Sequence, residues 1–280
     1  MKEERDYYYL GEFGFFILEI IGGLEEYFEK NKEEKINVTT FDNYAKLLKF
    51  LFPKNIIIKK EISFNGFKAT RCEHDSHINI DSSSKEIYYK KGFGKNLKYF
   101  NEISERKIKN KPSKQNFIYL KKPINFGNRG KKDCISLFPR NRDWCAKKNL
   151  NKNFWTDLIK EMQIEFPNKK IVVHGARSET LLIQGKNIIY PKDVLDQIEY
   201  LNRSIIFVSP DSGLVHFALA CGCDVLVIGN SYWPYLNYNP FGNQIRMISK
   251  KNVSKEKIIK MIKNKRKKAN ILDRAALSRN

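Results

Sequence analysis

Apolar residues recur at two different spacings along the first 60 positions of the chain. Short runs of β-branched or aromatic residues predict three strands, at 7–10, 35–40 and 56–58. Between them, apolar residues at helical spacing predict helices at 17–27 and 42–52, the second of which ends before Pro53. Strands that alternate with helices are typical of a parallel sheet whose faces the helices cover. This part of the chain is therefore expected to form an α/β domain.

The same alternation returns after an irregular stretch and one further expected strand at 116–120. In the second half, strands are predicted at 134–138, 170–174, 187–189, 204–208 and 224–228. Helices are predicted at 153–166, 193–201 and 212–221. We expect an N-terminal α/β domain over 1–125, a second α/β domain over 133–250, and a basic helix and tail over 251–280.

Charge changes this picture because it is clustered. The chain has 280 residues, and 52 Lys+Arg against 31 Asp+Glu give a net charge of +21. Residues 90–132 hold 14 basic and 2 acidic side chains, and residues 250–280 hold 12 and 2. These two blocks carry essentially all of the excess. A basic nucleic-acid-binding protein is therefore one alternative, although no recognisable nucleic-acid-binding module is present.

Other features concern the compartment and metal binding. No apolar run approaches the roughly 20 residues that cross a bilayer. The five cysteines form no CxxC pair, which suits a reducing compartment. The segment from Cys72 to His77 contains Cys, His, Asp and His, but a structural zinc site usually draws on two separated pairs of ligands. We expect a polar loop there, no metal and no cofactor, in a soluble cytoplasmic protein.

The most informative segment runs from Val208 to Gly229. An apolar strand leads into the turn Pro210-Asp-Ser-Gly213, then into a helix of small and apolar residues, then into another strand. Ligands of such sheets lie beyond the carboxyl ends of the strands. Free backbone N–H groups and the positive end of the helix dipole would form an anion site suited to a diphosphate, which His216 could also reach. The alternative is a plain helix cap by Asp211 or Ser212 with His216 facing the core.

The segment Ser209-Pro-Asp-Ser-Gly-Leu-Val-His216 resembles the donor-site motif of glycosyltransferase family 9, the lipopolysaccharide heptosyltransferases. The resemblance extends upstream to 135–142 and 147–155. It implies the GT-B fold: two Rossmann-like domains that face a central cleft, with a C-terminal helix that crosses back to the first domain. It also implies an enzyme that moves a sugar from a nucleotide-sugar donor to a glycan or lipid-linked acceptor hydroxyl, inverting and independent of metal.

The resemblance assigns roles at the donor site. Negative charge grows on the leaving β-phosphate, and no Asp-x-Asp pair is present to hold a metal there. Arg140 and Arg142 have the fork geometry for phosphate, and Lys148 matches the basic residue that family members carry before a Trp-bearing helix. Together with a helix N-terminus, these cations would replace a metal. The remaining residues of this donor site are Asp211, Ser212, Gly213 and His216.

Two acidic residues complete the expected site. Glu179 matches the position at which the family binds the donor ribose, although a carboxylate in the first turn of a helix also stabilises the helix dipole. Leu10-Gly-Glu-Phe-Gly14 resembles the family's Gly-Asp turn, which makes Glu12 the expected catalytic base for the acceptor hydroxyl. The alternative for Glu12 is an exposed side chain in a loop that begins a helix.

The two basic blocks acquire a further meaning from the resemblance. If the last helix crosses back to the first domain, residues 90–132 and 251–280 share one face. We expect that face to bind an anionic membrane surface or a charged glycan acceptor, on the inner membrane face, rather than a specific nucleic acid. A sugar-nucleotide epimerase or hydrolase on the same fold is the second alternative to a transferase.

Overall fold

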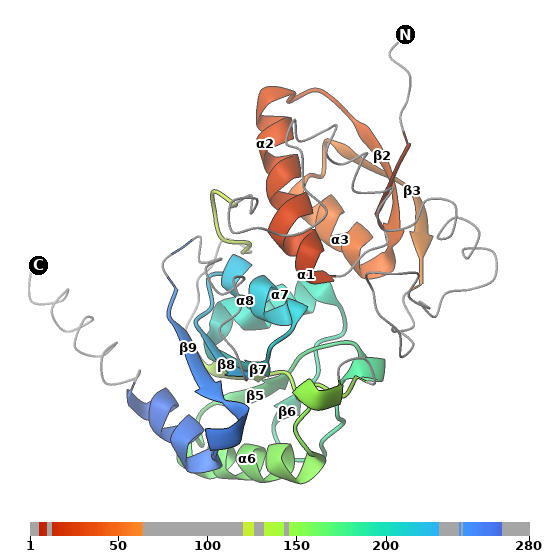
Figure 1. Cartoon of the computed structure of the whole chain (residues 1–280). Helices are drawn as coiled ribbons and strands as arrows, with labels where there is room; N and C mark the ends of the chain where they lie inside the picture. The colour runs from red at the N-terminus through yellow and green to blue at the C-terminus, as the bar shows by residue number, and fades with distance from the viewer. Residues whose placement is uncertain are drawn as a thin grey trace, which may run out of the picture.

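The computed structural model describes residues 6–9, 13–63, 120–125, 132–142, 146–229, 241 and 243–264. These residues form two separate parallel sheets with helices packed on them (Figure 1). The predicted α/β class is confirmed. The strand expected at 116–119 lies outside the described residues. None of the helices in the described part of the chain combines the length and apolar character needed to cross a bilayer.

The first sheet has the order β1-β2-β3, with β1 Asp6–Tyr9, β2 Ile36–Phe41 and β3 Ile56–Ile62, all parallel. Its helices are α1 (Phe13–Phe15), η1 (Phe16–Ile21), α2 (Gly22–Lys30) and α3 (Asp42–Leu51). Every residue of β2 is buried, as expected for the middle strand of a covered sheet. The π-helical turn η1 was not expected from the sequence.

The second sheet is formed by β4 (Cys134–Leu137), β5 (Lys170–Val173), β6 (Ile188–Ile189), β7 (Ser204–Pro210), β8 (Val225–Gly229) and β9 (Ile245–Ser249). The strands are parallel and have the order β6-β5-β4-β7-β8-β9. This is the strand order of a dinucleotide-binding fold, and the direction of winding reverses between β4 and β7. β9 was missed by the sequence analysis.

Helices cover both faces of the second sheet. α6 (Lys152–Glu165) packs on one face, and α7 (Val194–Arg203) and α8 (Gly213–Ala220) pack on the other (Figure 1). The side chains along β7, which point alternately to the two faces, explain why both faces need a cover. Ile206 and Val208 belong to the apolar cluster that contains α6, whereas Phe207 between them belongs to the cluster that contains α7 and α8.

One apolar cluster joins the two sheets. It combines residues of η1, α2 and α3 with residues of α7 and α8. The rings of Phe13 and Phe217 meet edge to face, with their centroids 5.1 Å apart. The segment 120–125 is fixed across the same junction, since the Ile124 N–H donates to the Ala220 carbonyl at 2.9 Å. The buried Asn202 amide donates to the Ile124 carbonyl at 3.0 Å. The two halves therefore share a continuous core.

The C-terminal helix does not lie where the sequence analysis placed it. Residues 255–264 are helical, and Ile258, Ile259 and Ile262 are buried in the cluster that contains α6. Lys255 and Lys263 form ion pairs with α6 at Glu161 and Glu165. The expectation that this helix crosses back to the first domain is wrong for residues 255–264. The cause is the short connection from β9, through the turn η5 (Lys250–Asn252), which keeps the helix on the sheet of β9.

The described parts of the two basic blocks consequently lie apart. Lys121 of the first block binds α2, where its N–H donates to Glu25 at 2.8 Å and its ammonium pairs with Glu29. The helix at 255–264 lies against α6 at the other end of the molecule (Figure 1). The described residues therefore do not place both blocks on one face.

Candidate functional site

The residues proposed for the donor site meet at the point where the second sheet reverses its winding. The chain after β4, residues 138–142, and the turn after β7, residues 210–213, leave the carboxyl ends of two adjacent parallel strands. Crevices at such points are where doubly wound sheets bind their ligands. The position of the motif in the fold is therefore the one that its sequence predicted.

Backbone hydrogen bonds join the loop after β4 to the loop after β5. Arg140 pairs with Thr180 in an isolated antiparallel bridge, and the Asn141 N–H donates to the Glu179 carbonyl at 2.8 Å. This pairing brings two distant side chains together, because Arg142 Nε lies 3.1 Å from Glu179 Oε1. Both side chains are 15% exposed. The sequence analysis named both residues but did not foresee their ion pair.

A second ion pair crosses from the short helix η2 (Ala146–Lys148) to the turn after β7. The Lys148 ammonium donates to Asp211 Oδ2 at 2.6 Å. Asp211 lies two residues before α8, so the pair holds a cation beside the positive end of that helix. A cation is unfavourable there unless negative charge is nearby. Asp211 supplies that charge in the free protein, and an anionic ligand would supply more.

The start of α8 is closely packed against the first half of the molecule. Ser212 occupies the N-cap position with an extended backbone, and its hydroxyl contacts the Ser209 hydroxyl at 3.1 Å rather than capping the helix. A Cβ on Gly213 would lie 2.7 Å from the backbone nitrogen of Gly14. Only glycine permits the starts of α1 and α8 to approach this closely. The helix cap by the Ser212 side chain, which the sequence left open as an alternative, is not formed.

His216 is buried one turn into α8, with 6% of its surface exposed. Burial lowers its pKa to about 4, the neighbouring Lys148 lowers the pKa further, and Asp211 opposes the shift. The imidazole is therefore neutral at pH 7. Its N–H group can donate a hydrogen bond to a phosphate oxygen, but the ring carries no positive charge.

Arg140 is buried, with 2% of its surface exposed, and its Nη1 donates to Asn149 Oδ1. The side chain thus supports the loop from inside rather than lining its surface. Asn149 itself was missed by the sequence analysis, because an asparagine in a basic loop carries no recognisable signal. Glu12 and the segment from Cys72 to His77 lie outside the described residues. Among the residues that are described, no group of three His, Cys, Asp or Glu side chains could hold a metal.

A buried polar group underlies the site. His174 follows β5 directly, and its Nε2 lies 2.8 Å from the Ser136 hydroxyl on β4. The ring is fully buried, and burial lowers its pKa to about 3, while the nearby Gln197 on α7 opposes the shift. This histidine is neutral and joins β4 to β5 within the core. Gly175, at φ 110°, then turns the chain toward Glu179.

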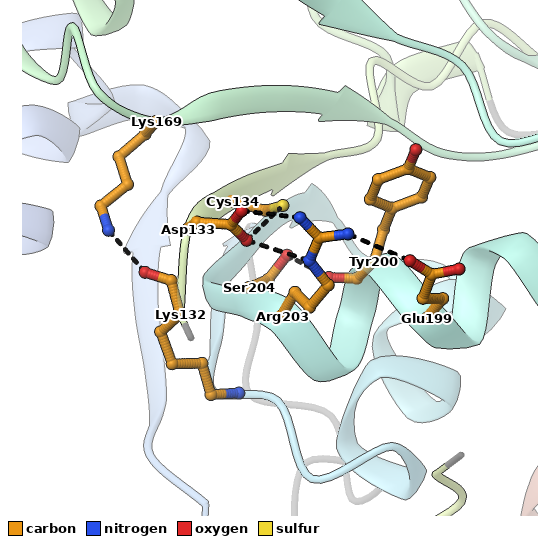
Figure 2. Close-up of polar contacts among 8 residues, drawn as sticks. All are labelled: Lys132, Asp133, Cys134, Lys169, Glu199, Tyr200, Arg203 and Ser204. Atoms are coloured by element: carbon orange, nitrogen blue, oxygen red, sulfur yellow. Dashed lines mark hydrogen bonds and ion pairs between the residues drawn. The ribbon is translucent and has the colours of Figure 1, made fainter. Parts of the chain in front are cut away.

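The amino ends of the same strands carry a different network (Figure 2). Arg203, at the end of α7, donates to Asp133 from Nε at 3.0 Å and from Nη2 at 2.6 Å, and to Glu199 at 3.0 Å. This bidentate bond lowers the pKa of Asp133 to about 2. The Lys169 ammonium donates to the Lys132 carbonyl nearby. The network connects the starts of β4, β5 and β7.

The sequence matches no protein-family profile, and no curated protein matches it. Solved structures do match it. An ADP-heptose LPS heptosyltransferase II of E. coli superposes with a TM-score of 0.55 at 11% identity, over 93% of this chain and 98% of the other. A glycosyltransferase of family 9 from Veillonella parvula superposes with a TM-score of 0.53 at 12% identity, over 93% and 96%.

The chain has the GT-B fold. The resemblance drawn from 209–216 is confirmed at the level of the fold, and the two structures just named are glycosyltransferases. A dodecameric iron-containing heptosyltransferase, TibC of enterotoxigenic E. coli, superposes with a TM-score of 0.44 at 12% identity. This chain spans 61% of the length of TibC. The site described above occupies the second sheet of the GT-B fold.

Proposed function

We propose that the protein is a glycosyltransferase that moves a sugar from a nucleotide-sugar donor to an acceptor hydroxyl. The observation that carries this proposal is the set of ion pairs at the winding reversal, Arg142 with Glu179 and Lys148 with Asp211. They place two cations at the end of the sheet where the GT-B fold offers a donor site. The fold of the neighbouring structures supports the same reaction class.

The chemistry of the step explains the need for these cations. When the bond between the anomeric carbon and the β-phosphate oxygen breaks, negative charge grows on the leaving diphosphate. Arg142, Lys148 and the N–H groups at Gly213 would stabilise that charge, because they are already held in place before the step begins. In this proposal the acceptor displaces the diphosphate directly, with inversion and without a metal.

The acceptor hydroxyl loses its proton as it attacks. We assign Glu12 as the base that accepts this proton. It immediately precedes Phe13 and Gly14 in the sequence. Gly14 lies against Gly213 at the start of α8, so the chain leading from Glu12 reaches the donor side. A carboxylate at that position would accept the proton, and the neutral His216 would act as a hydrogen-bond partner of the phosphate.

Nucleotide binding provides the first test. Thermal unfolding is measured with UDP, GDP, ADP, CMP and TDP. A nucleotide at about 100 times its Kd stabilises the folded state by about 2.7 kcal/mol, and raises Tm by about 5 °C or more in a protein of this size. The same nucleotide should shift the Tm of Lys148→Met far less. The variant Lys251→Met is the control, because Lys251 is exposed and its replacement removes the same charge.

Transfer provides the second test. With the matching nucleotide sugar, the wild-type chain should release the nucleoside diphosphate only when a hydroxyl acceptor is present. Release without any acceptor would indicate a hydrolase or an epimerase. Full transfer by a variant carrying both Arg140→Ala and Asp211→Ala would contradict the assignment of this site.

We also propose an anionic membrane surface as a partner of the basic blocks 90–132 and 251–280, on the cytoplasmic face. The helix at 255–264 supports this, because it buries three isoleucines while Lys257 and Lys260 are exposed. Sedimentation with phosphatidylserine vesicles, compared with neutral phosphatidylcholine vesicles, tests it. Equal sedimentation with both would contradict the proposal.

A further inference from the structure

One amide closes the loop that carries the two arginines. Asn149 Oδ1 accepts hydrogen bonds from Arg140 Nη1 and, at 3.4 Å, from the Arg142 backbone N–H. Asn149 Nδ2 donates to the Arg142 carbonyl at 2.9 Å. The Asn149 side chain thus holds the backbone N–H and carbonyl of Arg142 together with the guanidinium of the buried Arg140. The direction in which Arg142 leaves the loop, toward Glu179, depends on these bonds.

A lysine far away in the sequence fixes the neighbouring segment. The Lys250 ammonium donates to the Lys147 carbonyl at 2.6 Å and to the Asn149 carbonyl at 2.7 Å. These two carbonyls flank Lys148, so the backbone on both sides of Lys148 is held. A lysine suits this task because its ammonium offers three donors on a long flexible stem. Lys148 can then extend to Asp211 with its own backbone fixed.

We propose that Asn149 and Lys250 are positioning residues that hold Arg142 and Lys148 in the geometry that binds the donor diphosphate. The inference rests on the proposed function, in which those two cations contact the phosphates. Neither Asn149 nor Lys250 needs to touch the donor. Lys250 begins η5, the turn between β9 and the helix at 255–264, so the packing of that helix on α6 supports the donor site through one side chain.

The test compares two neighbouring lysines. Lys250→Met keeps the apolar stem and removes the donors, and Lys251→Met removes the same charge from an exposed position of the same turn. Isothermal titration measures Kd for the nucleoside diphosphate that stabilises the wild-type chain best, and for its nucleoside. We expect Lys250→Met to weaken diphosphate binding about tenfold or more, the value of a hydrogen bond to a charged group. Lys250→Arg should restore most of it.

The nucleoside separates positioning from general support of the fold. Because the proposed contacts are with phosphate, the affinity for the nucleoside should change less than about twofold in Lys250→Met. A general loss of structure would weaken the binding of both ligands and lower the Tm of the variant in the absence of nucleotide. Asn149→Leu should give the same split between diphosphate and nucleoside, and serves as an independent second variant.

A double-mutant cycle shows whether Lys250 acts through Lys148. If it does, the variant carrying both Lys148→Met and Lys250→Met binds the diphosphate no more weakly than Lys148→Met alone. Fully additive losses, or a Kd of Lys250→Met equal to that of Lys251→Met, would overturn the inference while leaving the proposed function intact. A wild-type chain that binds none of the nucleotides would overturn both.

Discussion

The two ends of the second sheet use the same chemistry for different purposes. At the amino ends, Arg203 binds Asp133 with two nitrogens and Glu199 with a third, within and beside α7. At the carboxyl ends, Arg142 with Glu179 and Lys148 with Asp211 connect the chain after β4 to the loops after β5 and β7. Both networks join residues that are distant in the sequence, at opposite ends of the same strands.

Helix dipoles explain what this difference means. Arg203 lies in the last turn of α7, where a cation is favoured by the negative end of the helix. Lys148 lies beside the first turn of α8, where a cation is disfavoured. Stability alone accounts for the amino-end network. At the carboxyl ends Asp211 offsets this unfavourable interaction in the free protein, and a bound anion would offset it further, which is why we place the donor there.

The largest effect is expected at the carboxyl ends. Replacing both Arg142 and Lys148 by methionine should lower kcat/KM for the donor by about a thousandfold, because each removes a group that stabilises the leaving charge. Tm should fall as well, because Glu179 and Asp211 are only 15% and 20% exposed and lose their cationic partners. Steady-state kinetics and a thermal scan measure the two quantities. Turnover within tenfold of wild type would break the comparison.

At the amino ends we expect a loss of stability without a loss of donor affinity. Arg203→Met should lower the free energy of unfolding by about 2 kcal/mol, since it leaves Asp133 without its bidentate partner, and donor affinity should stay unchanged. The pKa of Asp133 is lowered to about 2 by Arg203, so its contribution is present above its ordinary pKa near 4 and is lost as the pH falls toward 2. Urea midpoints of variant and wild type should therefore converge on acidification. A weaker donor affinity in Arg203→Met would show that the two ends are coupled.

A pH-dependent effect is expected from the two buried histidines of the carboxyl end. The pKa values of His174 and His216 are lowered to about 3 and about 4 by burial. As the pH falls below about 6.5, the unfolded chain binds protons first, and the free energy of unfolding should decrease by up to about 1.4 kcal/mol per pH unit for each histidine. Urea unfolding at pH 7, 6 and 5 measures this slope. A bound diphosphate should reduce only the contribution of His216 to this pH dependence, because an anion favours the protonated form of the imidazole. If His216→Gln had the same slope as wild type, this account would be contradicted.

The smallest effect is expected at the ion pair between the two halves. Lys46 on α3 lies 3.0 Å from Asp193 before α7, and the lysine is 46% exposed. Lys46→Met should change the free energy of unfolding by less than about 0.5 kcal/mol, because solvent screens such pairs. Chemical denaturation detects a difference of that size. A larger loss would mean that charge, and not the shared apolar core, joins the two sheets.

Local patterning predicted most of the fold. The strands that became β2, β4, β5, β7 and β8 are short apolar runs, and the helices between them have clear apolar spacing. β9, Ile245–Ser249, was missed because Arg246 interrupts its apolar pattern. The location of the C-terminal helix depended on tertiary packing, namely three isoleucines that fit against α6 rather than against the first sheet.

The site was predictable only in part, for the same reason. The turn Pro210-Asp-Ser-Gly213 is contiguous and has a recognisable chemistry, so the sequence located it. Asn149 and Lys250 act through hydrogen bonds to backbone groups, and Lys250 is about 100 positions from its partners. No local pattern records such a bond. The burial of Arg140 is likewise a property of packing.

The contact between Gly14 and Gly213 sets the distance between the two halves beside the turn after β7. Their backbones touch with no side chain between them, so the starts of α1 and α8 have a fixed separation. A Cβ on Gly213 would lie 2.7 Å from the Gly14 nitrogen, and α8 would have to move away from α1 to accommodate it. One added methyl group would thus carry Ser212 and the turn before it away from the segment that follows Glu12.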